Sequence, residues 1–360
     1  MKKQKVLVAM SGGVDSSVAA LLMKKQGYDV IGAFMKNWSG TKNSLGECNW
    51  KEERNHAIKI ATKLNIPLIT LDFEKPYRKK VVDKMFKDYK KGITPNPDID
   101  CNQKVKFPLL IKAAKKLGAK YVVTGHYARI KKNELLRASD EKKDQSYFLC
   151  KTKQNELKHL MFPIGNYTKK QVREIAKKNK FLNFDKKSTV GICFIGKVNL
   201  KEFLQKKIKP KHGKILDPKG NVIGKHDGIY YYTIGQRLGP RYGFEISKKN
   251  DNKKFMKRWY LASKNPRKNE IIAAPENHKL LYRKEIIIKK PHWISEKPKN
   301  NSKVHSRIRQ VGELLPSKIT FKNKKYKVTL NKPITGVSEG QAIVLYKGKK
   351  VLGGGEIKFK

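Results

Sequence analysis

The chain has 360 residues, which is enough for two or three domains with substantial cores. Its formal net charge of +53 favours a polyanionic partner such as a nucleic acid, and a genome rich in lysine codons is the alternative explanation. No apolar stretch is long enough to cross a membrane, and four cysteines without regular spacing exclude a secretory disulfide framework. The first apolar strand starts near Val6, so we expect no targeting peptide and a cytoplasmic location.

Strands and helices alternate from residue 5 to about residue 127. The pattern predicts strands at residues 6–8, 28–35, 66–71 and 120–124, and helices at residues 18–27, 52–64, 76–89 and 102–117. Repeated strand–helix–strand units indicate an α/β fold with a Rossmann-like parallel sheet, in which ligands bind at the carboxyl ends of the strands. The loop after the first strand and Gly125-His126 after a later strand should therefore share one edge and one site.

The loop after the first strand is suited to hold a pyrophosphate. Gly12 and Gly13 let the backbone approach phosphates without a Cβ clash, and the amino terminus of the following helix points to the same place. No lysine follows Gly13 where a Walker A loop needs one, and the dinucleotide fingerprint is absent. The string instead resembles the PP-loop of ATP pyrophosphatases, with Asp15 expected to face a divalent metal. The expected nucleotide-binding residues of this loop are Ala9, Met10, Ser11, Gly12, Gly13, Val14, Asp15 and Ser16.

Two of the four cysteines lie where chemistry is expected. Cys101 follows the proline-containing segment 94–100 and precedes a helix, whose dipole should lower the pKa of the thiol. Cys193 lies in a short apolar run flanked by glycines, and by itself it is typical of a buried small hydrophobe. Cys48 and Cys150 are expected to be structural. The sequence has no C-x-x-C pair and no Cys/His cluster, so no zinc or iron–sulfur site is expected.

The second half of the chain has a different pattern. Residues 145–198 continue as helices and loops, with a capped helix start at residues 168–176. A hairpin is expected at residues 213–224, and short alternating segments from about residue 280 indicate a small β-barrel. We therefore expect three domains, which are a catalytic domain with a helical extension at 1–198, a central β-rich domain at 199–278 and a C-terminal β-barrel at 279–360.

A series of motifs resembles the bacterial tRNA-specific 2-thiouridylases, a family of the PP-loop ATP pyrophosphatase superfamily. The motifs follow the family's order and cover the chain nearly end to end, at residues 11–17, 32–38, 94–102, 124–127, 143–149, 162–165, 191–196, 232–237 and 339–342. Three places depart from the family's pattern. Ser188 stands where an acidic residue is usual, Ile308 stands where an aromatic residue is common, and the loop after Arg237 differs from the glycine-rich version.

This resemblance implies an ATP-dependent sulfurtransferase that thiolates C2 of the wobble uridine, position 34, of tRNA. ATP with its Mg²⁺ would adenylate O2 so that AMP can leave, and Met35 and Gly125 would also line the nucleotide pocket. Cys193 would carry the sulfur as a persulfide, and Cys101 would cleave the S–S bond and leave a Cys101–Cys193 disulfide. In an alternative route Cys101 first liberates hydrogen sulfide. Asp98, beside Cys101, would act as general acid or base.

The resemblance also implies the partners. The expected substrates are the tRNAs for Lys, Glu and Gln, and the expected sulfur donor is a cysteine desulfurase or a sulfur-relay protein. Charged residues of the two β-domains would hold phosphates. The expected tRNA-binding residues, of which the first three contact the target base, are Asn96, Pro97, Asp98, His126, Lys143, Asp144, Gln145, Arg307, Ile308 and Gln341.

Two other functions fit part of the pattern. Another PP-loop adenylating ligase, such as a tRNA lysidine synthetase, would share the loop but would need no distant cysteine pair. A nucleic-acid-binding protein with a decayed ATP site would not need the intact string at residues 11–16. Thiol dependence excludes the first alternative, and tRNA-dependent pyrophosphate release excludes the second.

Overall fold

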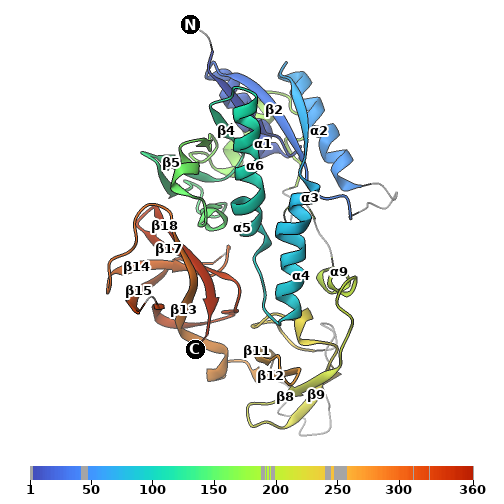
Figure 1. The fold of residues 1–360 in the computed structure, drawn as a ribbon, viewed down its shortest axis with the longest axis vertical. Helices are drawn as coiled ribbons and strands as arrows, with labels where there is room; N and C mark the ends of the chain where they lie inside the picture. Colours follow the sequence, from blue (N-terminus) through green and yellow to red (C-terminus); the bar gives the residue numbers. More distant parts are fainter. Residues whose placement is uncertain are drawn as a thin grey trace.

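Three β-sheets follow one another along the chain, and helices accompany mainly the first (Figure 1). The computed structural model describes residues 3–41, 48–187, 191, 193, 195, 199–239, 245–246, 258–310, 312–323 and 325–359. In Figure 1 the blue N-terminal sheet lies at one end of the molecule, the central sheet lies at the other end, and the red C-terminal barrel lies beside them. In these residues no helix is both long and apolar enough to cross a membrane.

The N-terminal sheet confirms the predicted parallel α/β arrangement. Its strand order is β3-β2-β1-β4-β7, with β1 at Lys5–Ala9, β2 at Asp29–Lys36, β3 at Leu68–Asp72, β4 at Tyr121–Val123 and β7 at Leu160–Met161. The helices of the first two crossovers are α1 (Val14–Lys25) and α2 (Asn49–Lys63). The carboxyl ends of β1, β2 and β4 lie at the same edge, because Ala9 pairs with Ala33 and Val8 with Val123.

Two predicted helices are longer than expected, and each contains a π-helical turn. The first runs through α3 (Glu74–Tyr77), η1 (Arg78–Val82) and α4 (Asp83–Lys90), and the second through α5 (Pro97–Cys101), η2 (Asn102–Lys106) and α6 (Phe107–Lys116). The second helix starts five residues before the predicted position, because Asn96 caps it by accepting the Ile99 N–H at 3.2 Å and Pro97 fits its first turn. Cys101 is therefore inside a helix rather than in front of one.

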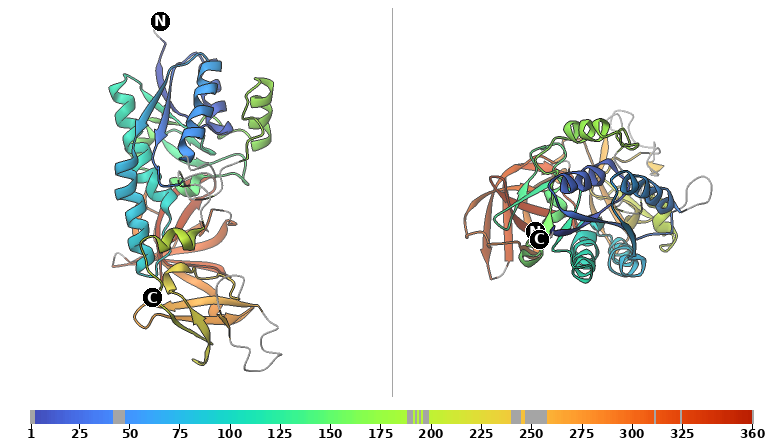
Figure 2. Two further views of the ribbon diagram at one scale, coloured as in Figure 1. Left: turned by 90° about the vertical axis from the view of Figure 1, so that its right-hand side faces the viewer. Right: turned by 90° about the horizontal axis from the view of Figure 1, so that it is seen from above.

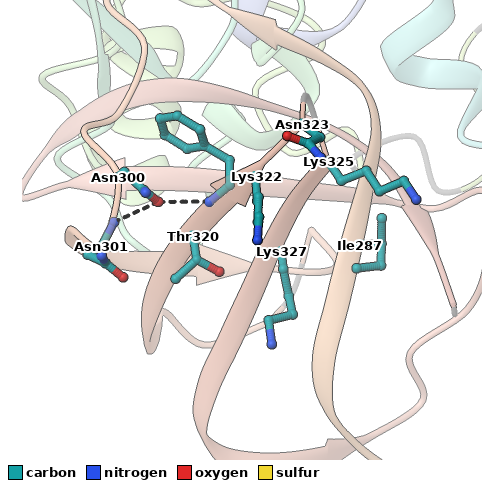
Figure 3. A pocket seen from close by; sticks show the side chains of 9 residues that line it. Ile287, Asn300, Asn301, Thr320, Lys322, Asn323, Lys325 and Lys327 are labelled. Atoms are coloured by element: carbon teal, nitrogen blue, oxygen red, sulfur yellow. Dashed lines mark hydrogen bonds between the residues drawn. The ribbon is translucent and has the colours of Figure 1, made fainter.

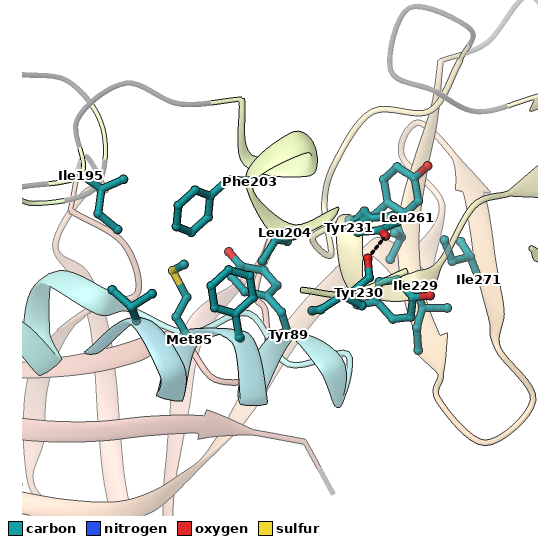
Figure 4. Close-up of a cluster of buried hydrophobic side chains, with 14 of the residues drawn as sticks. Met85, Tyr89, Ile195, Phe203, Leu204, Ile229, Tyr230, Tyr231, Leu261 and Ile271 are labelled. Atoms are coloured by element: carbon teal, nitrogen blue, oxygen red, sulfur yellow. Dashed lines mark hydrogen bonds between the residues drawn. The ribbon is translucent and has the colours of Figure 1, made fainter. Parts of the chain in front are cut away.

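The central sheet packs against the first of these interrupted helices. The predicted hairpin is confirmed as β8 (Gly213–Leu216) and β9 (Val222–His226), and β10 (Glu245–Ile246), β11 (Trp259–Asn265) and β12 (Glu270–Pro275) complete the sheet. Figure 4 shows Met85 and Tyr89 of α4 beside Phe203 of α9 (Leu200–Gln205) and Tyr230 of the central domain. This shared apolar cluster fixes the central sheet to the helix pair that carries Cys101.

The C-terminal strands form the predicted barrel. The strands are β13 (Tyr282–Trp293), β14 (Lys303–Arg307), β15 (Leu315–Lys322), β16 (Lys325–Thr335), β17 (Ala342–Lys347) and β18 (Lys350–Lys358), and pairing of β13 with β18 closes the ring. An unpredicted hairpin, β5 (Ala128–Lys131) and β6 (Glu134–Arg137), extends this sheet. It joins β18 through the pair Lys350–Leu136, so the first domain and the barrel share one sheet (Figure 2).

Four short elements and one helix complete the described chain. They are η3 (Ser146–Leu149), α7 (Gln154–Leu157), η4 (Ile229–Tyr231), η6 (Lys279–Leu281) and α8 (Lys169–Lys178). The start of α8 is as predicted, since Thr168 and Gln171 form a capping box.

Candidate active site

The loop between β1 and α1 has the form of a phosphate cradle. Gly13 is the residue before α1, and Gly12 has a φ of +78° with no room for a Cβ, which would lie 2.3 Å from the Glu53 carbonyl oxygen. The Ser16 hydroxyl donates to the Gly13 carbonyl at 2.9 Å and accepts the Ser11 N–H at 3.1 Å. A Cβ on Gly13 would meet nothing nearer than the Ser11 hydroxyl at 3.5 Å, so the space before the helix is open. These features fit the phosphates of ATP.

Gly125 brings the end of β4 against this loop. A Cβ on Gly125 would lie 2.7 Å from both the Asp15 carbonyl carbon and the Ser16 nitrogen, which are backbone atoms. Met10 and Met35, the expected nucleotide-site residues at the ends of β1 and β2, are buried nearby in the sheet. The predicted shared edge is therefore present in the structure.

Replacing Gly125 by alanine should weaken ATP binding about tenfold or more, because the added methyl group must displace the PP-loop backbone. Equilibrium dialysis with labelled ATP measures the effect. Gly118→Ala is the matched control, since its Cβ meets nothing within 4 Å and its cost is confined to the backbone at φ +67°. ATP affinity that is the same in the two variants would contradict the close approach.

Asp15 makes contacts that its sequence did not predict. Its Oδ1 accepts a hydrogen bond from Lys169 Nζ at 2.6 Å and another from the Tyr127 hydroxyl at 2.9 Å. The carboxylate therefore ties the start of α1 to the start of α8. Among the described residues, no three His, Cys, Asp or Glu side chains gather where they could hold a metal ion.

Asn183 supports the same loop and was missed by sequence reasoning. Its Nδ2 donates to the Gly12 carbonyl and to the Ser17 hydroxyl, both at 3.0 Å, and the side chain is buried. One asparagine far along the chain carries no sequence signal for this role. Only the packing of the segment after α8 brings it to the loop.

The segment before Cys101 is held by the barrel. Gln341 Nε2 donates to the Pro95 carbonyl at 2.9 Å, and its Oε1 accepts from Asn96 Nδ2 at 3.3 Å. The Thr94 N–H also donates to the Glu339 carbonyl at 3.1 Å. Two of the expected tRNA-binding residues, Asn96 and Gln341, are thus brought into contact with each other.

Cys101 and Cys193 are brought together. Their thiols are hydrogen-bonded to each other, and neither is part of a disulfide. The Cys193 N–H donates to Asp98 Oδ1 at 2.9 Å, and the Cys193 carbonyl accepts from the Tyr77 hydroxyl. The main chain of Cys193 is therefore held on both sides by the interrupted helices.

The two thiols have opposite pKa shifts. The hydrogen bond from Cys101 lowers the pKa of Cys193, and the Lys106 ammonium lowers it further against the effect of burial. The hydrogen bond to Cys193 and burial raise the pKa of Cys101 well above its ordinary value. The predicted lowering of the Cys101 pKa by a helix dipole is wrong, because Cys101 lies inside the helix and donates its proton to Cys193. The resting nucleophile is the Cys193 thiolate.

His126 lies at the sulfur site. Its Nδ1 is 2.6 Å from the Thr124 hydroxyl and its Nε2 is 3.5 Å from Lys106 Nζ, which in turn is 3.9 Å from Cys193 Sγ. Burial, and next to it the Lys106 charge, hold the pKa of His126 well below its ordinary value, so the ring is neutral. Lys106 was missed by sequence reasoning, because a lysine in so basic a chain carries no signal.

The remaining expected tRNA-binding residues fall into an exposed and a buried group. Lys143 is exposed, and Gln145 Oε1 accepts a backbone N–H at 2.9 Å. Asp144 and Arg307 are buried and form an ion pair at 2.8 Å, and Ile308 is buried beside them in sequence. This pair joins the first domain to strand β14 of the barrel.

The other two cysteines have ordinary structural surroundings. Burial raises the pKa of Cys150 to about 12, and Cys48 Sγ donates to the Ser39 carbonyl at 3.3 Å. Ser188, Gly196 and most of the loop after Arg237, where the sequence departs from the 2-thiouridylase pattern, lie outside the described residues.

A basic cavity lies on the barrel, apart from the residues above. It has a volume of about 380 Å³, and the side chains of Lys322, Lys325 and Lys327 lie around it with Asn300 and Thr320 (Figure 3). It contains none of the expected site residues. Its lysines are suited to an anionic group.

Family models match most of the chain. Residues 4–197 match the tRNA methyl transferase HUP domain, residues 201–275 the tRNA methyl transferase PRC-barrel domain, and residues 283–357 the aminomethyltransferase beta-barrel domain.

Curated relatives are similar over nearly the full length. The tRNA-specific 2-thiouridylase MnmA of Lactobacillus helveticus (strain DPC 4571) is 40% identical over 365 residues, covering 99% of this chain and 95% of its own. The tRNA-specific 2-thiouridylase MnmA 2 of Aliarcobacter butzleri (strain RM4018) is 42% identical over 366 residues, covering 99% of both chains. The tRNA-specific 2-thiouridylase MnmA of Ruthia magnifica is 41% identical over 364 residues, covering 100% of this chain and 98% of its own.

Proposed function

This chain belongs to the tRNA-specific 2-thiouridylases, the sulfurtransferases of the PP-loop superfamily, and from that membership we propose how its own residues thiolate the wobble uridine of tRNA. The observation that carries the proposal is the hydrogen-bonded pair of Cys101 and Cys193. The residues 124–126 connect this pair to the PP-loop. Gly125 packs on the loop backbone, and His126 contacts the lysine that reaches Cys193.

The first chemical step activates the uridine. Uridine O2 attacks the α-phosphorus of ATP, so that an O2–AMP bond forms and pyrophosphate leaves. The cradle formed by residues 9–16 holds the phosphates, and Mg²⁺ would enter with ATP. Met35 and Gly125 line the nucleotide pocket. This step turns the poor leaving oxygen of C2 into AMP.

The second step transfers sulfur. The terminal sulfur of a Cys193 persulfide attacks C2, AMP leaves, and C2 becomes linked to Cys193 through two sulfur atoms. The Cys101 thiolate then attacks Cys193 Sγ, the S–S bond to the base breaks, and its electron pair stays on the sulfur at C2 as the thiocarbonyl. The resulting Cys101–Cys193 disulfide needs a thiol reductant to return to the observed dithiol. Release of hydrogen sulfide by Cys101 before attack is the alternative route.

Asp98 is suited to carry a proton between the two cysteines. Burial raises its pKa, although the Cys193 N–H and the Lys106 charge oppose the shift. A carboxyl group with a raised pKa accepts and returns a proton more readily near neutral pH. We assign it the proton from Cys101, whose raised thiol pKa makes a base necessary.

The tRNA would reach this site with the target base out of the anticodon stack. Asn96, Pro97 and Asp98 would contact the base, since they lie directly before Cys101. Lys143 and the lysines around the barrel cavity would hold phosphates. Asp144, Gln145, Arg307, Ile308 and Gln341 would act mainly by holding the domains around the RNA, and His126 mainly through Lys106, because these are their contacts in the structure.

The finer assignments complete the proposal. The substrates would be the tRNAs for Lys, Glu and Gln, the sulfur would come from a cysteine desulfurase or a relay protein, and the reaction would take place in the cytoplasm. We also propose that the three domains divide at residues 1–198, 199–278 and 279–360.

The test is mass spectrometry of tRNA nucleosides after incubation of the chain with unmodified tRNA, ATP, Mg²⁺ and sulfide or a desulfurase with cysteine. We expect 2-thiouridine at position 34, with one AMP and one pyrophosphate released for each thiolated base. Pyrophosphate release without any thiolated nucleoside would favour another adenylating ligase. Thiolation that persists without ATP would contradict the activation step.

A further inference from the structure

Lys106 is the cation that lies nearest to the Cys193 sulfur among the contacts described. We propose that Lys106 is a catalytic residue of the sulfur transfer, whose ammonium holds the charge on Cys193 and then on its persulfide while His126 fixes the direction of the lysine. This assignment deepens the proposed function and rests on it for the persulfide.

The helix geometry aims Lys106 at the sulfur site. Residues Asn102–Lys106 form a π-helical turn directly after Cys101, closed by the Phe107 N–H bonding to the Asn102 carbonyl. Hydrogen bonds that span five residues bring positions 101 and 106 toward one face, where an ordinary α-helix would separate them. Lys106 Nζ therefore lies 3.9 Å from Cys193 Sγ while Cys101 contacts the same sulfur.

The charges around Cys193 make a cation necessary. Asp98 and Cys101 of the second interrupted helix and Tyr77 of the first face the Cys193 residue, and each of them disfavours further negative charge when ionised. Burial lowers the pKa of Lys106, but Cys193, Cys101 and Asp98 outweigh this effect and raise the pKa above its ordinary value. Lys106 thus remains charged in the half-buried position where it serves the sulfur.

His126 holds the ammonium in place. The ring is neutral, and its Nδ1 faces the Thr124 hydroxyl at 2.6 Å, which leaves Nε2 to accept from Lys106 at 3.5 Å. Phe107 and Phe162 pack edge-on against the imidazole and restrict its rotation. His126 is therefore a positioning residue, since it acts on the sulfur through Lys106.

The measurement is the pH dependence of Cys193 alkylation by iodoacetamide, followed by peptide mass spectrometry without tRNA or ATP. Lys106→Met should raise the inflection by about one pH unit, which is about tenfold slower alkylation near neutral pH. Lys106→Arg should restore most of the rate, because the guanidinium keeps the charge. Lys112→Met, a change at an exposed lysine of the same helix, should match the unmodified chain.

An unchanged inflection in Lys106→Met, with the thermal melt also unchanged, would overturn the assignment. If Lys106→Met does not fold, Lys106→Gln replaces it with the same expected and contrary results. Single-turnover thiolation should fall about tenfold or more in Lys106→Met with ATP affinity retained. If no variant, including the unmodified chain, forms 2-thiouridine, the proposed function fails, while the alkylation profile still decides whether Lys106 charges Cys193.

Discussion

Cys101→Ser and Cys193→Ser are each expected to abolish 2-thiouridine formation, with a loss of at least about a thousandfold. Serine cannot carry a sulfane sulfur at position 193, and at position 101 it cannot attack an S–S bond. ATP binding should be retained, because the PP-loop is connected to this pair only through residues 124–126. Nucleoside mass spectrometry measures the first effect and equilibrium dialysis with ATP the second.

The controls for this experiment are the other two cysteines. Cys48→Ser and Cys150→Ser should retain thiolation, since neither thiol lies in the Cys101–Cys193 pair. Loss of the buried Cys150 thiol should lower stability rather than chemistry. Ordinary amounts of 2-thiouridine from either Cys101→Ser or Cys193→Ser would contradict the proposed sulfur route.

Arg307→Met is expected to destabilise the chain by about 3 kcal/mol, because it leaves Asp144 buried with much of its charge uncompensated. Arg137, whose Nε lies 3.6 Å from the same carboxylate, keeps the loss from being larger. Urea unfolding measures the change in the free energy of unfolding. The barrel should separate more easily from the first domain, so tRNA affinity should fall together with stability.

Arg309→Met is the matched control for the ion pair. Arg309 is exposed and lies two residues further along the chain, so its replacement should leave the free energy of unfolding within about 0.5 kcal/mol of the unmodified chain. A stable Arg307→Met variant that binds tRNA weakly would contradict a structural role. That result would instead favour direct contact of Arg307 with the RNA.

Much of the fold could be predicted because its signals are local. The apolar run at Val6–Val8, the glycine turn and the helix after it are adjacent in sequence, and strand β1 and helix α1 appear where expected. The hairpin β5–β6 could not be placed, because its partner strand β18 lies far along the chain and a single register pair joins them. The early start of the second interrupted helix was missed because two prolines were interpreted as a turn.

The candidate site divides in the same way. The cysteines and the PP-loop could be identified from motifs, and the structure confirms that the two thiols meet. Lys106 and Asn183 could not be identified, since their roles depend on a π-helical turn and on the packing of a distant segment. The burial of Asp144 with Arg307 was likewise invisible, because a charged pair has the same sequence signature on a surface as in an interior.

The contact between Asn96 and Gln341 has a consequence for biosynthesis. The two residues are separated by 245 positions, so the ribosome makes the sulfur-site helix long before it makes the side chain that holds its entry segment. A growing chain can assemble its nucleotide loop early, while the thiol centre waits for the barrel to arrive. Incomplete translation products should consequently retain nucleotide affinity without the capacity to spend a sulfur atom on unfinished chemistry.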